Sequence, residues 1–202
     1  MQYVLTEEQE LLRETVRRLA KEKVEPGARK RDETGEFDWE MVALFRENDL
    51  FGLDFPAEYG GSDAGMLSLI IAVEELSKVD ASAGLLIDLQ ELGTLPIMLA
   101  GNEEQKKKYL PRLASGEHLA AFALTETSGG SDVASFRCQA KRDGDAYILN
   151  GSKIFISNGG VADVLTVYAL TNPEKGGHRG AGVFIVEKGT PGFSVGKKED
   201  KM

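Results

Sequence analysis

Cysteine and histidine are scarce in this chain. Cys138 is the only cysteine among its 202 residues, and His118 and His178 are the only histidines. One thiol cannot form an internal disulfide, and one thiol with two imidazoles leaves too few soft ligands for a structural zinc site. We therefore expect a protein of a reducing compartment that holds no metal ion.

Long hydrophobic runs are also lacking. The most apolar stretch, residues 85–100, falls short of the roughly 20 apolar residues that a membrane-spanning helix needs. It is interrupted by Asp88, Gln90, Glu91, Gly93 and Pro96. The first residues lead at once into charged ones, with neither the apolar segment of a signal peptide nor an Arg-rich amphipathic leader. These absences predict a cytoplasmic protein without a membrane partner.

Positive charge is in the minority. Lysine and arginine number 24 against 33 aspartates and glutamates, which gives a formal net charge of -9. Because so acidic a chain repels phosphate backbones, nucleic acid is not expected as a partner. The one dense basic cluster, residues 106–108, fits the solvated face of a helix. Hydrophobic residues at 42% and charged residues at 28% are typical of a globular protein.

Helix signals fill the first part of the chain. Thr6 and Gln9 form a capping box, in which their side chains satisfy free N–H groups at a helix start. Apolar residues then recur at helical spacing at Leu12, Val16, Leu19 and Ala20. Four further helices are expected: one capped by Asp38, one capped by Asn102 with Gln105 that runs to about Ser115, and two over residues 67–78 and 81–99. Five helices joined by short loops predict a bundle.

From Leu119 the pattern changes to short β-branched and aromatic runs separated by Gly, Asn and Asp, which is typical of antiparallel strands. Asp143-Gly144 and Asn150-Gly151 are both hairpin signals because they tolerate positive φ. Further strands are expected at residues 164–170, 182–187 and 193–196. The sequence therefore predicts an α+β protein of two domains. An all-α helical bundle covers residues 1–117, and a small antiparallel β-barrel or sandwich, incomplete at its C-terminal end, covers residues 118–202.

Two segments of the β-rich part carry candidate binding residues. In the first, residues 121–132, a strand runs into a loop where Gly129 and Gly130 allow close approach of the backbone to a ligand. Its hydroxyls, at Thr125, Ser128 and Ser131, suit phosphate oxygens or a heteroaromatic edge. Taken alone, such a loop is more often a plain turn.

The second segment, residues 149–160, is interpreted as a hairpin that ends in another polar glycine turn. Phe155 could stack on a planar cofactor, and Ser157, two residues on, would lie on the same face of the strand and could hydrogen-bond that cofactor. Taken alone, Phe155 fits a core residue better. The two segments follow each other about 30 residues apart, and their combination favours the cofactor interpretation.

Together these segments resemble the acyl-CoA dehydrogenase family. The resemblance covers essentially the whole chain and includes residues 5–9, 55–61, 101–106 and 195–202. The last of these stretches is most similar to short-chain acyl-CoA dehydrogenases. Two positions depart from the family's common pattern. Thr127 stands where Pro is usual, which implies a less rigid loop, and Phe155 stands where Trp is usual, which keeps an aromatic face.

The resemblance implies that the chain binds FAD. It assigns cofactor contacts to Phe122, Ala123, Leu124, Thr125, Glu126, Gly130, Ser131, Phe155, Ile156 and Ser157. The Leu124 backbone and the Thr125 hydroxyl would meet the polar edge of the flavin. Phe155 would cover one ring face while Ser157 reaches toward N5. Ser131 is assigned to the substrate as well, because FAD and CoA would come close there.

The resemblance also implies a reaction. A carboxylate removes the α-proton of an acyl-CoA thioester while the β-hydrogen passes as hydride to flavin N5. The family's catalytic Glu lies in a third, helical domain, so no catalytic residue is expected in this chain and the base is expected beyond Met202. An acyl-CoA substrate, an electron-transferring flavoprotein as electron acceptor, a role in fatty acid metabolism and a homotetramer of the full-length protein are implied in the same way.

Two other readings stay open. One is an acyl-CoA oxidase or flavin monooxygenase on the same scaffold, and the other is a non-catalytic fragment or assembly partner. Among other candidate residues, Glu126 fits a surface or loop-orienting carboxylate better than a general base. His178 and Arg179 fit a solvated loop better than a CoA phosphate contact. Glu74 and Glu75 fit an exposed helix face or an ion pair.

Overall fold

The computed structural model describes residues 4–199, and the chain divides into two compact units. One unit comprises Met1–Glu91 with Gly101–Glu117, and the other comprises Leu92–Ala100 with His118–Met202. A single long helix, α5 (Ala81–Ala100), therefore contributes its first part to the helical unit and its last part to the β-rich unit.

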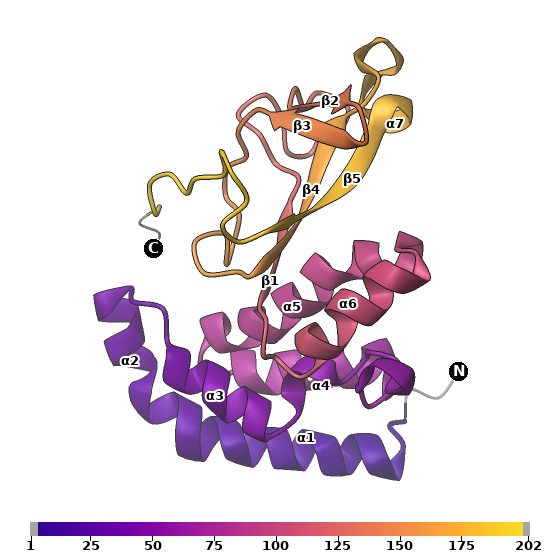
Figure 1. Ribbon diagram of the computed structural model, residues 1–202. Helices are drawn as coiled ribbons and strands as arrows, with labels where there is room; N and C mark the ends of the chain where they lie inside the picture. Colours follow the sequence, from indigo (N-terminus) through magenta and orange to yellow (C-terminus); the bar gives the residue numbers. More distant parts are fainter. Residues whose placement is uncertain (1–3, 200–202) are drawn as a thin grey trace. The chain divides into compact units, whose positions relative to one another are not determined.

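The helical unit contains all five expected helices (Figure 1). Its elements are α1 Glu7–Leu19, α2 Glu25–Thr34, α3 Trp39–Glu47, α4 Gly65–Ser77, the first part of α5, and α6 Glu103–Ala114. The sequence analysis missed α2, which continues from α1 through a π-helical turn at Ala20–Val24. Proline near its start and Gly35 in the left-handed conformation at its end are ordinary helix signals.

The predicted caps of this unit are confirmed. Thr6 and Asn102 each form a complete capping box with the residue three positions on, and the Asp38 side chain accepts from the Met41 N–H. Phenylalanines fill the core, with Phe45, Phe51 and Phe55 fully buried. Each of these caps is local in sequence, which is why sequence reasoning found it.

The β-rich unit is built on β4 (Val164–Leu170). This strand pairs along its whole length with antiparallel β5 (Ala181–Glu187), and its other edge pairs in parallel with β1 (Ala120–Ala123). At Leu170 that same edge also meets β2 (Gln139–Asp143), which forms a hairpin with β3 (Ala146–Asn150). A short helix, α7 (Gly176–Gly180), precedes β5.

Several predictions about this sheet are wrong. The order of a helical part followed by an incomplete β domain is confirmed, since the sheet does not close, but the sheet is mixed rather than antiparallel because β1 and β2 both run parallel to β4. The Asp143-Gly144 hairpin is present, but no strand follows Asn150-Gly151. Residues 193–196 also form no strand. Parallel pairing joins segments far apart in the chain, so local turn signals cannot reveal it.

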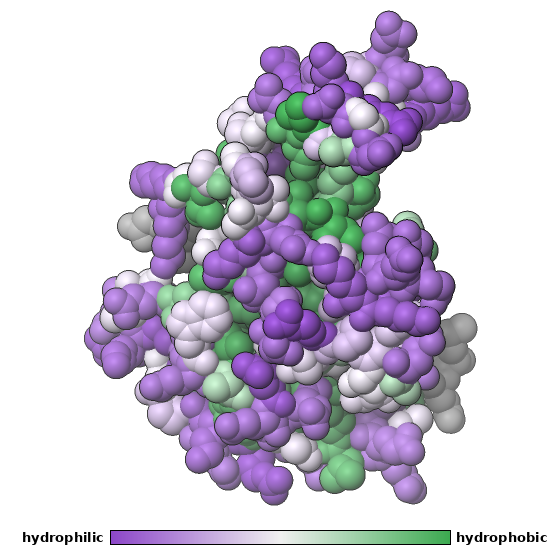
Figure 2. Space-filling view, in the orientation of Figure 1, coloured by the Kyte–Doolittle hydropathy of each residue, from purple (hydrophilic) through white to green (hydrophobic). Residues whose placement is uncertain are grey.

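The open sheet leaves apolar surface uncovered within its own unit. Hydrophobic side chains gather over β4 and β5 in Figure 2, and Ile148 of β3 and Val183 of β5 are exposed. The buried side of the sheet centres on Ala121, Leu165 and Val186, against which Ile156 packs.

By length and composition alone, α5 qualifies as a candidate membrane span, contrary to the expectation for residues 85–100. Of its most apolar window, 56% is buried inside the protein. Because the core helices of soluble proteins pass the same test, this observation is weak evidence for a membrane.

Candidate functional site

The first candidate segment leaves the sheet at the end of β1. The ring of Phe122 lies edge-on to that of Tyr168 on the paired strand β4, with centroids 5.2 Å apart. After Ala123 the chain forms a tight turn in which Glu126 and Gly129 exchange two backbone hydrogen bonds, each 3.2 Å long. Pairing with β4 therefore holds the start of the segment, and its own turn shapes the end.

The two glycines of this turn have different reasons to be glycine. A Cβ at Gly129 would lie 1.9 Å from Oγ of Ser135 and 2.7 Å from the carbonyl oxygen of Asp132, so the loop's own packing excludes a side chain. A Cβ at Gly130 would meet only Cγ2 of Thr125, at an ordinary 3.5 Å. The protein itself therefore leaves space at Gly130.

The second segment lies against the first without forming a hairpin. The Ile154 N–H donates to the Thr125 carbonyl at 2.9 Å, which joins the two segments directly. No strand runs through residues 151–157, so the argument that Phe155 and Ser157 share a strand face is wrong. The chain turns instead, because Phe155 and Asn158 both have left-handed backbones, with φ of 56° and 60°.

Phe155 has two unusual properties for a phenylalanine. Its side chain is 62% exposed, which excludes the core role considered from the sequence. Its left-handed backbone is uncommon for a bulky residue and costs on the order of 1–2 kcal/mol. Strained, exposed aromatic residues of this kind are found at ligand sites.

Glu126 and Lys153 form a buried ion pair between the two segments. The Lys153 Nζ lies 2.7 Å from Oε1 of Glu126, and both side chains are more than nine-tenths buried. The same ammonium donates to the Leu124 carbonyl at 2.9 Å and lies 4.7 Å above the ring centroid of Phe136. Glu126 is therefore not a surface carboxylate, and the loop-orienting interpretation describes its contacts.

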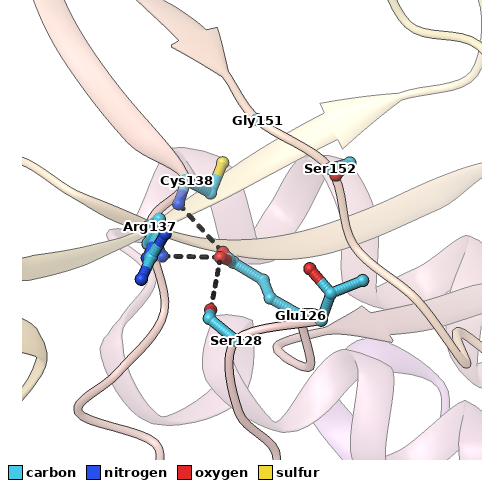
Figure 3. A pocket seen from close by; sticks show the side chains of 7 residues that line it. Glu126, Ser128, Arg137, Cys138, Gly151 and Ser152 are labelled. Atoms are coloured by element: carbon cyan, nitrogen blue, oxygen red, sulfur yellow. Dashed lines mark hydrogen bonds between the residues drawn. The ribbon is translucent and has the colours of Figure 1, made fainter.

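Backbone donors complete the coordination of Glu126 (Figure 3). The N–H of Arg137 donates to Oε2 at 2.5 Å and the N–H of Cys138 to Oε1 at 2.9 Å. Burial alone would raise the pKa of Glu126, but the hydrogen bonds from Lys153 and these two N–H groups outweigh it and lower the pKa below its ordinary value. Glu126 is therefore ionised at neutral pH.

A pocket of about 450 Å³ opens beside this carboxylate. It is lined by Glu126, Thr127, Ser128, Arg137, Cys138, Gly151 and Ser152. Glu126 is the only lining residue that the sequence assigned to cofactor contacts. The Sγ of the buried Cys138 faces Gly151, where an added Cβ would come within 2.9 Å of it. Burial is the main cause that raises the pKa of this thiol, so it stays protonated.

The other assigned residues follow the two segments. Phe122, Leu124, Thr125, Ile156 and Ser157 are partly buried, Ala123 is buried, and Gly130, Ser131 and Phe155 are exposed. Within residues 4–199 the hydroxyls of Thr125 and Ser157 have no hydrogen-bond partner in the protein. Each is free to bond a ligand.

Sequence reasoning missed the residues that hold the segments together. Lys153 was given no role, and neither were the backbone donors of Arg137 and Cys138. Lys153 lies 27 positions from Glu126, with a strand pair between them, and no periodicity links the two. The one available signal was an acidic residue in one segment and a basic residue in the other.

Two family models match this chain. The model described as "Acyl-CoA dehydrogenase, N-terminal domain" matches residues 6–117, and "Acyl-CoA dehydrogenase, middle domain" matches residues 121–202. An acyl-CoA dehydrogenase of Bacillus subtilis is 47% identical over 98% of this chain and 52% of its own length. A short-chain-specific acyl-CoA dehydrogenase of Clostridium acetobutylicum is 46% identical over 100% of this chain and 53% of its own length. The chain thus spans about half the length of these relatives.

Solved structures agree with these matches. The electron transferring flavoprotein structure of Acidaminococcus fermentans, concerned with flavin-based electron bifurcation, contains a chain with a TM-score of 0.95 and 44% identity. Butyryl-CoA dehydrogenase from Megasphaera elsdenii gives a TM-score of 0.93 with 41% identity. A glutaryl-CoA dehydrogenase from Mycobacterium smegmatis in complex with FADH2 gives 0.89 with 33% identity. Their matches cover 98% or more of this chain and 50–54% of those chains.

Proposed function

This chain belongs to the acyl-CoA dehydrogenase family, and on that premise we propose that it supplies the FAD- and CoA-binding portion of an enzyme that dehydrogenates an acyl-CoA thioester. FAD, when bound, supplies the acceptor for the hydride that leaves Cβ of the acyl chain. Because the chain spans about half the length of its relatives, we assign the catalytic base to a part of the full-length enzyme that this chain does not include. Glu126 does not qualify, because both of its carboxylate oxygens already accept hydrogen bonds.

One observation supports the proposal most directly. The Ile154 N–H bonds to the Thr125 carbonyl, so the two segments that the sequence assigned to FAD adjoin each other in the folded chain. Next to this junction lie the exposed ring of Phe155 and the unpartnered hydroxyls of Thr125 and Ser157. An aromatic face beside free hydroxyls fits a planar heterocycle with polar edges.

The roles of the individual residues follow from their chemistry. Phe155 would stack on the ring system, and the hydroxyls of Thr125 and Ser157 would donate to its polar atoms. The open backbone at Gly130 and Ser131 would approach phosphate oxygens, with Ser131 also near CoA. The remaining contacts are proposed for Phe122, Ala123, Leu124 and Ile156, and for the main chain of Glu126, since its side chain is bonded within the protein.

For the full-length protein we further propose an acyl-CoA substrate, an electron-transferring flavoprotein as electron acceptor, a homo-oligomeric assembly and a cytoplasmic location. The relatives named above support the substrate class, since one is described as short-chain specific. The match to a chain in an electron transferring flavoprotein structure supports the electron acceptor.

The proposal is tested by titrating the purified chain with FAD and recording flavin fluorescence and the visible spectrum. We expect weak but saturable binding. Riboflavin is the matched control, because it carries the ring system without the phosphates proposed to lie at Gly130 and Ser131. A chain that perturbs neither spectrum nor fluorescence of FAD does not carry the proposed site.

An acyl-CoA oxidase is the second candidate function, because an oxidase on the same scaffold would share the motifs that resemble the acyl-CoA dehydrogenase family. It differs in how the reduced flavin meets oxygen. Stopped-flow reoxidation of the full-length protein separates the two functions: slow reaction with oxygen is expected for a dehydrogenase, and fast reaction with peroxide release identifies an oxidase.

A further inference from the structure

We propose that the buried Glu126–Lys153 ion pair positions the two flavin-binding segments against each other, so that the two charged side chains serve the reaction by positioning these segments rather than as ligands of the flavin. The inference deepens the proposed function and rests on it. The proposed role of Glu126 and Lys153 is to hold the flavin-binding segments in place.

The ion pair lies where the two segments meet. Lys153 is the residue before Ile154, whose N–H bonds to Thr125, and it is two residues before Phe155. Glu126 is the residue after Thr125. The ion pair thus flanks the one backbone hydrogen bond that joins the segments, and it holds the groups proposed to contact the flavin within two residues of itself.

Lys153 bonds to both the backbone and a side chain of the first segment. Its Nζ donates to the Leu124 carbonyl at 2.9 Å and to Oε1 of Glu126 at 2.7 Å. With the Ile154 bond, three hydrogen bonds cross between residues 124–126 and 153–154. These three hydrogen bonds fix both the spacing and the register of two irregular segments that share no strand pairing.

Glu126 also connects the junction to the sheet. The N–H groups of Arg137 and Cys138, at the entry to β2, donate to its two oxygens, and the Ser128 hydroxyl lies 3.4 Å from Oε2. Figure 3 shows the carboxylate turned toward these donors. Each carboxylate oxygen thus accepts two hydrogen bonds from the protein, which leaves no acceptor position for a ligand.

A buried ion pair gives little net stability, because desolvation offsets the attraction between the charges, yet it constrains geometry strongly when each group is fully hydrogen-bonded. Loss of one partner leaves an uncompensated buried charge. The presence of this pair at the junction of the two segments is therefore better explained by the arrangement that it imposes than by stability.

The experiment replaces Lys153 in the purified chain. Lys153→Met removes the charge and all three donors while keeping an unbranched apolar stem, and Lys153→Arg keeps the charge and the donors. Amide hydrogen exchange is measured without flavin, and the dissociation constant for FAD is measured in parallel. Exchange at the Ile154 N–H reports on the junction whether or not the chain binds FAD.

For Lys153→Met we expect the Ile154 amide to exchange at least tenfold faster, beyond any change shared by the amides of β4 and β5. We also expect FAD to bind about tenfold more weakly, with both effects largely restored in Lys153→Arg. Glu75→Gln is the matched control, because it breaks a buried ion pair in the helical unit; it should leave FAD affinity and Ile154 exchange unchanged apart from any global effect.

Two results overturn the inference. If Lys153→Met accelerates exchange equally at Ile154 and throughout β4, the pair only stabilises the unit as a whole. If Ile154 loses protection while FAD affinity stays the same, the junction does not position the flavin. Failure of the wild-type chain to bind FAD is a different outcome, because it rejects the proposed function while the exchange data still test the junction.

Discussion

Arg17 of α1 binds Glu75 of α4 with both ends of its guanidinium edge, Nε to Oε2 and Nη2 to Oε1, each at 2.9 Å. The Glu75 side chain is 2% exposed, whereas that of Arg17 is 48% exposed. Lys78 adds a third hydrogen bond to Oε1. The ion-pair interpretation of Glu75 is confirmed, and it joins two helices that lie 58 positions apart in the chain.

Replacing this carboxylate should weaken the helical unit in a pH-dependent way. The hydrogen bonds from Arg17 lower the pKa of Glu75 to about 2, against the opposing effect of burial. Because the pKa of Glu75 is lower in the folded state than in the unfolded state, the ionised carboxylate stabilises the folded protein at pH values above about 4.5. That stabilisation is lost as the pH falls toward 2. Since Arg17 and Lys78, the two cations that bind Glu75, are each half exposed, we expect Glu75→Gln to cost on the order of 1–2 kcal/mol at neutral pH.

Thermal unfolding of the wild type and Glu75→Gln, followed from pH 7 down to pH 2, measures this effect. The difference in Tm should be largest above about pH 5 and shrink steadily below it. A difference independent of pH would mean that packing, rather than charge, explains the loss.

Glu91 should have the opposite dependence on pH. Burial is the main cause that raises its pKa to about 7, with smaller contributions from Asp54 and Asp88. Oε1 of Glu91 and Oδ1 of Asp54 are both buried, and neither has a hydrogen-bond partner within residues 4–199. A pKa raised in the folded state means that stability falls as pH rises from about 4.5 through 7, where the buried carboxyl must ionise.

The neutral substitution Glu91→Gln removes that cost. We expect it to stabilise the chain by on the order of 1–2 kcal/mol at pH 8 and to leave stability unchanged at pH 4. Urea unfolding at the two pH values measures both. Destabilisation at pH 8 would show that Glu91 is held ionised by a favourable partner, contrary to its surroundings here.

Replacing the strained Phe155 should weaken FAD binding without lowering the free energy of unfolding. Phe155→Gly relieves the left-handed strain, worth on the order of 1–2 kcal/mol, and this offsets the greater freedom of glycine in the unfolded chain, about 0.5–1 kcal/mol. Because the ring is exposed, no core packing is lost. Stability should therefore not fall, while FAD binds about three- to tenfold more weakly through loss of stacking.

Phe155→Trp is the matched variant, since it keeps an aromatic face at the same backbone position. It should retain FAD affinity, as measured by fluorescence titration. If Phe155→Gly binds FAD as tightly as the wild type, the ring does not stack on the flavin.

The sequence predicted what depends on neighbouring residues and missed what depends on distant ones. The caps at Thr6, Asp38 and Asn102 and the strand over residues 164–170 were found because each signal lies within one element. The hairpin predicted at Asn150-Gly151 is wrong, because its turn signal reflects neighbouring residues only. The chain that follows bonds instead to a distant segment, through the Ile154 N–H and the Thr125 carbonyl, 29 positions earlier.

The same distinction applies to the candidate site. The binding segments were recognised by composition and by family resemblance, both of which are readable along the chain. The burial of Glu126 was not, because an ionised carboxylate is buried at low cost only where compensating groups converge on it, here Lys153 and two backbone N–H groups. That convergence is a property of the folded chain, and residue spacing does not encode it.

Adjacent glycines in the first segment offer a direct test of ligand approach. Gly129→Ala forces a Cβ against the carbonyl of Asp132, so we expect a loss of on the order of 1–3 kcal/mol and weaker FAD binding together. Gly130→Ala places its Cβ at an ordinary distance from Thr125, and the backbone there is not left-handed. The free protein should therefore keep its Tm.

Gly130→Ala is the informative member of this pair, because any effect it has on binding cannot come from the fold. If phosphate oxygens approach the backbone at Gly130, the added methyl group blocks them, and FAD affinity falls at unchanged Tm while riboflavin binding stays the same. Equal losses for the two ligands would point to the ring system instead. Unchanged affinity for both would remove Gly130 from the site and leave Gly129 as a residue that serves only the shape of the turn.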